Sequence, residues 1–127
     1  MMQRILLLIL LVFSLACASK KSTKETVENE NSKKLLVISF ISRGTGTNSA
    51  LYGKTKEFLD KKVEDKNCST SFQVKPWGRE GERDICIETN SSCYGNLFEE
   101  IKTLIAADDR VQIKENQVCR ETKTKMF

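Results

Sequence analysis

The spacing of apolar residues changes period several times along this 127-residue chain, and the order of those periods constrains the fold more than any other feature. The continuous apolar run LLVISFIS (35–42) is typical of a buried central strand. After a glycine-containing break, apolar residues recur at helical spacing from Asn48 and fade by EDKNC. Alternating apolar residues then predict strands over 70–77 and 83–89, with the glycines of GREGE marking a hairpin loop between them.

A second helix and a last short strand complete the pattern. The apolar stripe of this helix consists of Leu97, Ile101, Leu104 and Ile105. Asn96 followed by Glu99 resembles a capping box at the helix start, and VQIKEN (111–116) predicts the strand. The order β-α-β-β-α-β predicts an α+β, ferredoxin-like sandwich, in which four antiparallel strands carry two helices on one face.

Two loops are expected to meet at one end of this sandwich, because the first and second strands point the same way. They are SRGTGTN (42–48) and the hairpin loop with its flanking Trp (77–83). Backbone N–H groups before a helix can hold an anion, and Trp and Arg are common binding hot spots. The candidate binding residues are Arg43, Gly44, Thr45, Gly46, Thr47, Trp77, Arg79, Glu80 and Glu82.

Each loop also has a purely structural interpretation. The glycines of the first loop serve a tight turn that needs positive φ. The hairpin loop is a solvated, charged tip with Trp77 packed across the strand pair. A lone G-x-G lacks the further residues of a nucleotide-binding motif.

The residue types disfavour an enzyme. The chain has no histidine, which excludes Ser-His, Cys-His and His-metal chemistry. No catalytic residues, metal or cofactor are expected, and a binding domain is favoured over a small hydrolase or a thiol-redox protein. The formal net charge is +4, but most of the basic excess precedes residue 35. A nucleic-acid-binding domain concentrates positive charge on its folded part, so no nucleic-acid partner is expected.

The N-terminus carries an export signal. Arg4 precedes ILLLILLVFSL (5–15), an apolar run shorter than the roughly 20 residues that span a bilayer. Ala16-Cys17-Ala18 fits ordinary signal-peptide cleavage and secretion. A buried core helix is the other alternative.

FSLAC (13–17) also resembles the lipobox of bacterial lipoproteins, with Ser14 where leucine is more usual. The resemblance implies a signal peptide over 1–16 and acylation of Cys17, which becomes the first residue of the mature protein. It therefore implies a bacterial envelope protein anchored to the membrane by lipid. No aspartate follows Cys17, which resembles lipoproteins that are sent on to the outer membrane. An unanchored secreted or periplasmic protein is the alternative.

The segment after Cys17 is polar. SKKSTKETVENENSKK (19–34) cannot bury enough apolar surface to fold, so residues 17–34 are expected to be a lipidated cysteine and a flexible tether. A single α+β domain is expected over 35–120, followed by a loose tail over 121–127.

The number of cysteines, together with the export signal, predicts disulfides. The cysteines are Cys17, Cys68, Cys86, Cys93 and Cys119. Without Cys17 four remain, which predicts two disulfides in an oxidising compartment. Sequence leaves three pairings open. Cys68–Cys93 and Cys93–Cys119 are the easier ones, because all three residues are placed at the end opposite the two loops, and Cys86 is harder to place. The alternatives are free thiols and a four-cysteine zinc site, although the chain lacks the C-x-x-C spacing that is usual in such sites.

The pattern SRGTGTNS … VKPWGREGERDICIE … VCR, over about 36–120, resembles a recurring type of small exported bacterial protein of no known function. The resemblance supports the strand-helix-hairpin frame and implies no activity and no functional residues. The partners expected are the membrane, through the anchor, and an envelope protein or a small ligand.

Overall fold

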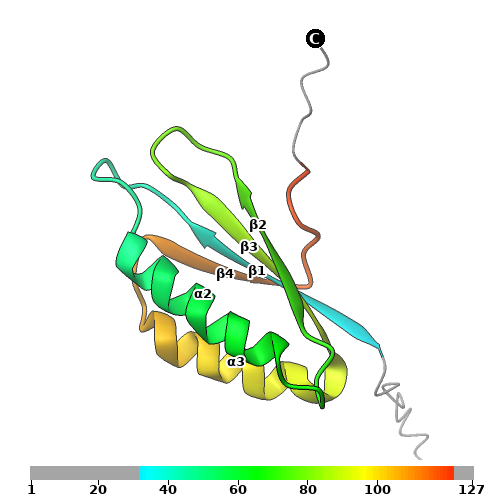
Figure 1. The fold of residues 1–127 in the computed structure, drawn as a ribbon. Coiled ribbons are helices and arrows are strands. Elements are labelled where there is room, and N and C mark those ends of the chain that lie inside the picture. Colours follow the sequence, from blue (N-terminus) through cyan, green and yellow to red (C-terminus); the bar gives the residue numbers. More distant parts are fainter. Residues whose placement is uncertain (1–31, 122–127) are drawn as a thin grey trace, which may run out of the picture.

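The structure, a computed structural model, describes residues 32–121. Its elements are β1 (Lys33–Phe40), α2 (Ser49–Val63), β2 (Ser71–Pro76), β3 (Arg83–Asn90), α3 (Ser91–Ile105) and β4 (Val111–Glu115). The strands form one antiparallel sheet in the order β2-β3-β1-β4, and both helices cover the same face (Figure 1). The expected α+β, ferredoxin-like arrangement is confirmed. The expected signal peptide, Cys17, most of the tether and residues 122–127 of the tail lie outside the described residues.

Strand β1 is central because its run of apolar residues can be buried on both sides. Leu36, Ile38 and Phe40 belong to the core between sheet and helices, and Ile38 is paired with Ile85 of β3 and Ile113 of β4. The other buried core residues are Leu59, Ile85, Ile87, Leu97, Ile101, Ile105 and Val111. These residues come from both helices and three strands, so a single core holds the domain together.

Helix α2 begins where Asn48 caps it. The Leu51 N–H donates to Asn48 Oδ1 at 3.0 Å. Thr55 and Leu59 form its buried stripe. Because an N-cap fixes where the first turn starts, Asn48 also fixes where the preceding loop must end.

Helix α3 begins at Ser91, so the capping box expected at Asn96 is wrong. Asn96 lies inside the helix and is exposed. Residues distant in sequence extend the helix backwards, since Cys93 in the first turn is bonded to Cys68 and the Tyr94 hydroxyl donates to Glu115 Oε1 at 2.6 Å. Burial, together with the Glu115 carboxylate, raises the pKa of Tyr94.

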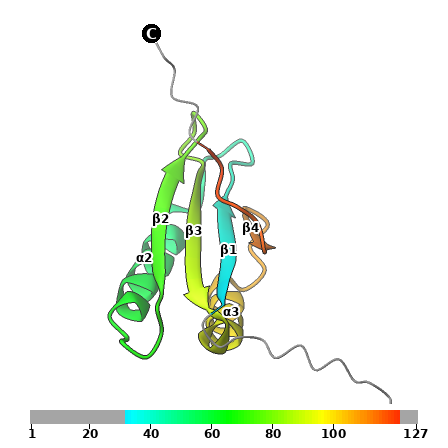
Figure 2. The same ribbon diagram turned by 90° about the vertical axis from the view of Figure 1, so that its right-hand side faces the viewer.

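The chain after β4 turns back over the sheet. Asn116 has φ 54°, and its N–H makes a last backbone hydrogen bond to Leu35 O at 2.9 Å. Residues 117–121, here called the strap, then cross the face of the sheet that the helices leave open (Figure 2). Cys119 in the strap is bonded to Cys86 in the middle of β3.

The two disulfides lie in different places. Cys68–Cys93 closes the end opposite the loops, with a Cα–Cα distance of 5.9 Å, as one of the two favoured pairings predicted. The other favoured pairing, Cys93–Cys119, is wrong, because the strap carries Cys119 away from that end. Within residues 32–121 no helix is long and apolar enough to cross a bilayer, and no acidic or cysteine cluster is arranged to hold a metal ion.

Candidate binding site

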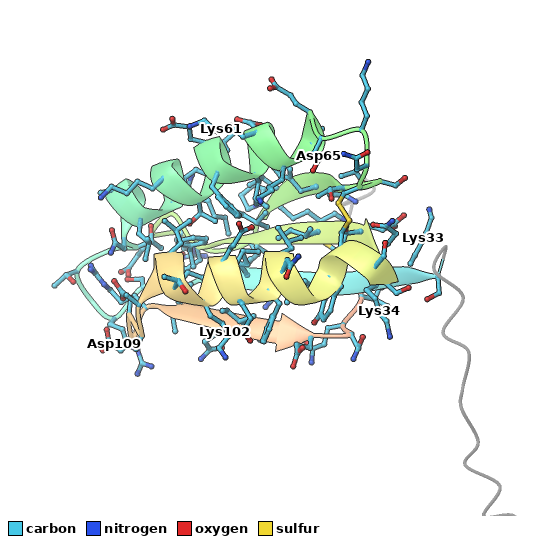
Figure 3. All side chains as sticks on the ribbon, turned by 90° about the horizontal axis from the view of Figure 1, so that it is seen from below. Lys33, Lys34, Lys61, Asp65, Lys102 and Asp109 are labelled. Atoms are coloured by element: carbon cyan, nitrogen blue, oxygen red, sulfur yellow. A yellow bond between two sulfur atoms is a disulfide. The ribbon has the colours of Figure 1, made fainter. Side chains whose placement is uncertain are left out.

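Three loops gather at one end of the sheet. They are the β1–α2 loop (41–48), the β2–β3 hairpin loop (77–82) and the α3–β4 loop (106–110), and together they form what we call the loop end. In Figure 3 Asp109 marks the loop end, whereas Lys33 and Lys34 lie at the other end, where the chain enters β1. The sequence predicted the meeting of the first two loops and missed the third.

The Ser42 hydroxyl joins the first two loops. Ser42 Oγ donates to Glu80 Oε2 across 38 positions of sequence. It also accepts hydrogen bonds from the backbone N–H groups of Gly44 at 3.3 Å and Gly46 at 3.2 Å. The candidate residues of the two loops are therefore brought together, but the two glycine N–H groups are already used within the loop and are not free to hold an anion.

Two glycines with positive φ lie where these loops are in contact. Gly46 has φ 81°, and a Cβ there would lie 4.0 Å from the backbone oxygen of Glu80. Gly81 has φ 90°, and a Cβ there would lie 3.5 Å from Thr47 Oγ1. Positive φ is strained for residues with a Cβ, which supports the turn interpretation of these glycines.

Trp77 is held on the open face of the sheet, at the base of the hairpin loop. Its indole Nε1 donates to Asp84 Oδ1 at 2.9 Å, and the Arg120 guanidinium lies 4.3 Å from the ring centroid. Its backbone N–H donates to Glu82 O at 3.0 Å. The residue remains 39% exposed. Trp77 thus does pack across to the neighbouring strand, and it also presents a fixed, partly exposed aromatic surface.

The arginines of the loop end differ in how they are engaged. Arg79 is exposed and makes no hydrogen bond or ion pair with any other residue that the structure describes. Arg83 lies over the Tyr52 ring at 4.2 Å and donates to Gly81 O at 3.0 Å. Arg43 donates to the backbone oxygen of Asp109 at 3.2 and 3.3 Å. Of these three arginines, Arg79 is therefore the most available to a partner, since Arg43 and Arg83 hold the loops in place.

The carboxylate of Glu82 is used inside the hairpin. Glu82 Oε2 accepts from the Glu80 N–H at 2.8 Å, and the Glu82 side chain passes over Gly78, where it occupies the space that a Cβ would need. Thr45, in the first loop, is exposed. Glu82 thus shapes the hairpin part of the loop end.

The third loop is tied to helix α2 through Asp108. Asn48 Nδ2 donates to Asp108 Oδ2 at 2.7 Å, and the Arg110 N–H donates to Asp108 Oδ1 at 2.8 Å. The hydrogen bond from the Arg110 backbone, and then the one from Asn48, lower the pKa of Asp108 below its ordinary value of 3.8.

Replacing Asp108 by asparagine should change the acid stability of the domain. Because the pKa is lower in the folded state, the carboxylate stabilises the fold above about pH 4, and this contribution is lost as the pH falls through the folded-state pKa. The variant should therefore have a lower urea midpoint at pH 7 and a shallower loss of stability below pH 4. Asp109→Asn is the matched control, because only its backbone oxygen is engaged. Equal behaviour of the two variants at both pH values would contradict this assignment.

A buried polar cluster lies beneath Trp77, and sequence reasoning did not assemble it. Asp84 is 3% exposed and accepts from both Trp77 and Arg120, the latter at 3.4 Å. Ser39, its cross-strand neighbour on β1, is 1% exposed, and its hydroxyl makes no hydrogen bond with the residues described. The alternation of β3 places Asp84 and Cys86 on one face. A bridge between Cys86 and Cys119 would bring the next residue, Arg120, close to Asp84, and this was the signal that the sequence offered.

Two hollows of the surface lie away from the loop end. One of about 340 Å³, between the two helices, is lined by the Cys68–Cys93 bridge and by residues such as Asp65 and Glu100. Another of about 390 Å³ lies beside Lys33 and Glu88. Neither of these two hollows includes a residue of the loop end.

Comparisons with protein-family models, with curated proteins and with solved structures find no match to this chain.

Proposed function

We propose that this chain is an exported envelope protein, anchored by lipid at Cys17, whose loop end binds a partner protein. The observation that carries the binding role is the pairing of a fixed, 39% exposed Trp77 with the unengaged Arg79 beside it. Trp and Arg dominate binding energy at interfaces, above all when they are preorganised. Here Asp84 and Arg120 hold the indole before any partner arrives.

The placement of the chain ends supports an anchored protein. The described chain enters at Lys33, and the loop end is at the far side of the domain (Figures 1 and 3). A tether attached at Lys33 therefore leaves the loop end unobstructed. The two disulfides are compatible with an oxidising compartment outside the cytoplasm.

A protein is the partner class that the geometry favours. Exposed loops with acidic and basic side chains present a broad surface of mixed charge, and the hollows of about 340 and 390 Å³ lie elsewhere. Mixed charges around an aromatic anchor provide specificity at protein interfaces.

Trp77→Ala and Arg79→Ala should each weaken partner binding. Removal of an interface hot spot of about 2 kcal/mol weakens binding roughly thirtyfold. The full-length protein is used to capture partners from a detergent extract of the envelope, and the affinity for the captured protein is then measured for each variant. Arg79→Ala is the cleaner change, since Arg79 makes no hydrogen bond or ion pair with the other residues that the structure describes.

Lys61→Ala provides the control. Lys61 is equally exposed but lies on the outer face of α2, where it pairs with Glu57 (Figure 3). It should bind the partner like the unchanged protein. Unchanged affinity of both the Trp77→Ala and Arg79→Ala variants would remove the loop end from the proposed interface.

A further inference from the structure

The strap is held to the domain by few contacts. No residue from 117 to 121 makes a backbone hydrogen bond to the rest of the described chain. Its attachments are the Cys86–Cys119 bridge and the contacts of Arg120 with Trp77 and Asp84. Val118, in its middle, is 80% exposed. The strap thus gains almost nothing from burial of its own side chains.

The disulfide, and not the arginine, keeps the strap in place. Ordering a segment of this length opposes folding through the conformational entropy of every residue in it. Arg120 makes one cation–π contact with Trp77 and one charged contact with Asp84 at 3.4 Å. Together these two contacts stabilise the strap by less than the free-energy cost of ordering it. Without the bridge the strap should therefore leave the sheet, and Arg120 should leave Trp77 with it.

The bridge is within reach of a thiol. A hollow of about 250 Å³ on the open face is lined by Cys86 and Cys119 together with Val37, Gln117 and Val118. Cys119 itself is only partly buried. A thiolate that enters this hollow meets the disulfide without prior unfolding of the sheet.

We propose that the Cys86–Cys119 bridge is a redox-sensitive switch that sets the conformation of Trp77, and thereby regulates the loop end in its proposed binding function. The reductant is a dithiol. One thiolate attacks Cys119 Sγ and expels the Cys86 thiolate, which takes up a proton. The second thiol then attacks the mixed disulfide and expels Cys119, so that the dithiol leaves as a disulfide and two electrons have entered the bridge. Oxidation by the reverse steps closes the strap again.

Trp77 reports on the switch directly, because it is the only tryptophan of the chain. The test uses the full-length Cys68→Ala/Cys93→Ala variant, in which Cys86–Cys119 is the remaining bridge. Dithiothreitol should shift its tryptophan emission to the red and raise the acrylamide quenching constant about twofold, since a residue that is 39% exposed can become fully exposed. The Cys86→Ala/Cys119→Ala variant should show the raised value before reduction and no change after it.

A cysteine variant that loses its far-ultraviolet circular dichroism is unfolded and cannot test the switch. The Arg120→Ala variant keeps both bridges and provides the test in that case. It should raise the quenching of Trp77 with the strap still covalently attached. Unchanged quenching in Arg120→Ala, or in the reduced Cys68→Ala/Cys93→Ala variant with its circular dichroism intact, would overturn the switch. This readout needs no partner. Partner affinity that is unchanged in both the Trp77→Ala and the Arg79→Ala variants would overturn the proposed function and leave the switch standing.

Discussion

Ile38→Ala should lower the free energy of unfolding by about 2–5 kcal/mol, the range for truncating a large aliphatic side chain in a core. Ile38 is fully buried in the central strand and is paired with Ile85 on one side and Ile113 on the other. Strand pairing on both sides leaves little freedom for the cavity to collapse. Urea unfolding of the oxidised full-length protein, followed by circular dichroism, measures the loss.

Val118→Ala is the matched control, because it shortens an aliphatic side chain that is 80% exposed. Its effect should stay within about 0.5 kcal/mol. A loss for Ile38→Ala as small as that of the control would mean that the core is not centred on β1.

Loss of the Cys68–Cys93 bridge should have the second large effect. The bridge closes a separation of 25 residues, for which the loop-entropy model gives about 3–4 kcal/mol. Both of its ends are well fixed in the folded state, one before β2 and the other in the first turn of α3. The Cys68→Ala/Cys93→Ala variant should therefore unfold at a clearly lower urea concentration.

The Cys86→Ala/Cys119→Ala variant tests whether the stabilisation by a bridge depends only on the length of the loop that it closes. Its bridge closes a longer separation, 33 residues, so the model taken by itself predicts an equal or larger loss. We expect a smaller loss, because the freed strap regains entropy in the folded state while the strands and helices remain in place. A larger loss in this variant than in Cys68→Ala/Cys93→Ala would show that the strap is an integral part of the fold.

The sequence was sufficient to predict the secondary-structure order, because each element carries its own period. The run 35–42 and the alternation of Ile85 and Ile87 predicted the central strands, although β1 begins at Lys33, earlier than expected. The start of α3 was missed because local capping rules favoured Asn96, whereas contacts of Cys93 and Tyr94 with distant parts of the chain extend the helix. Such contacts leave no local signal in sequence.

The sequence predicted only part of the candidate site, because some of its residues are placed by contacts between distant parts of the chain. Topology brings together the loops that contain Arg43 and Trp77, so the order of elements was enough to place them at one end. The contribution of Arg120 depends on the turn at Asn116, which reverses the chain across the open face. A residue with positive φ after the last strand was not recognised, and the position of Arg120 was missed with it. The Cys86–Cys119 pairing was one of the three that the sequence left open.

The intact mass of the mature protein tests the central claim most directly, namely that Cys17 is used for the anchor and the other four cysteines form two bridges. For the full chain expressed in a bacterium, we predict a protein that begins at Cys17, carries acyl chains there, and gains only the hydrogens of two disulfides on reduction. A mature chain that begins at Ser19 without lipid, or one whose four remaining cysteines are alkylated without prior reduction, would contradict the account.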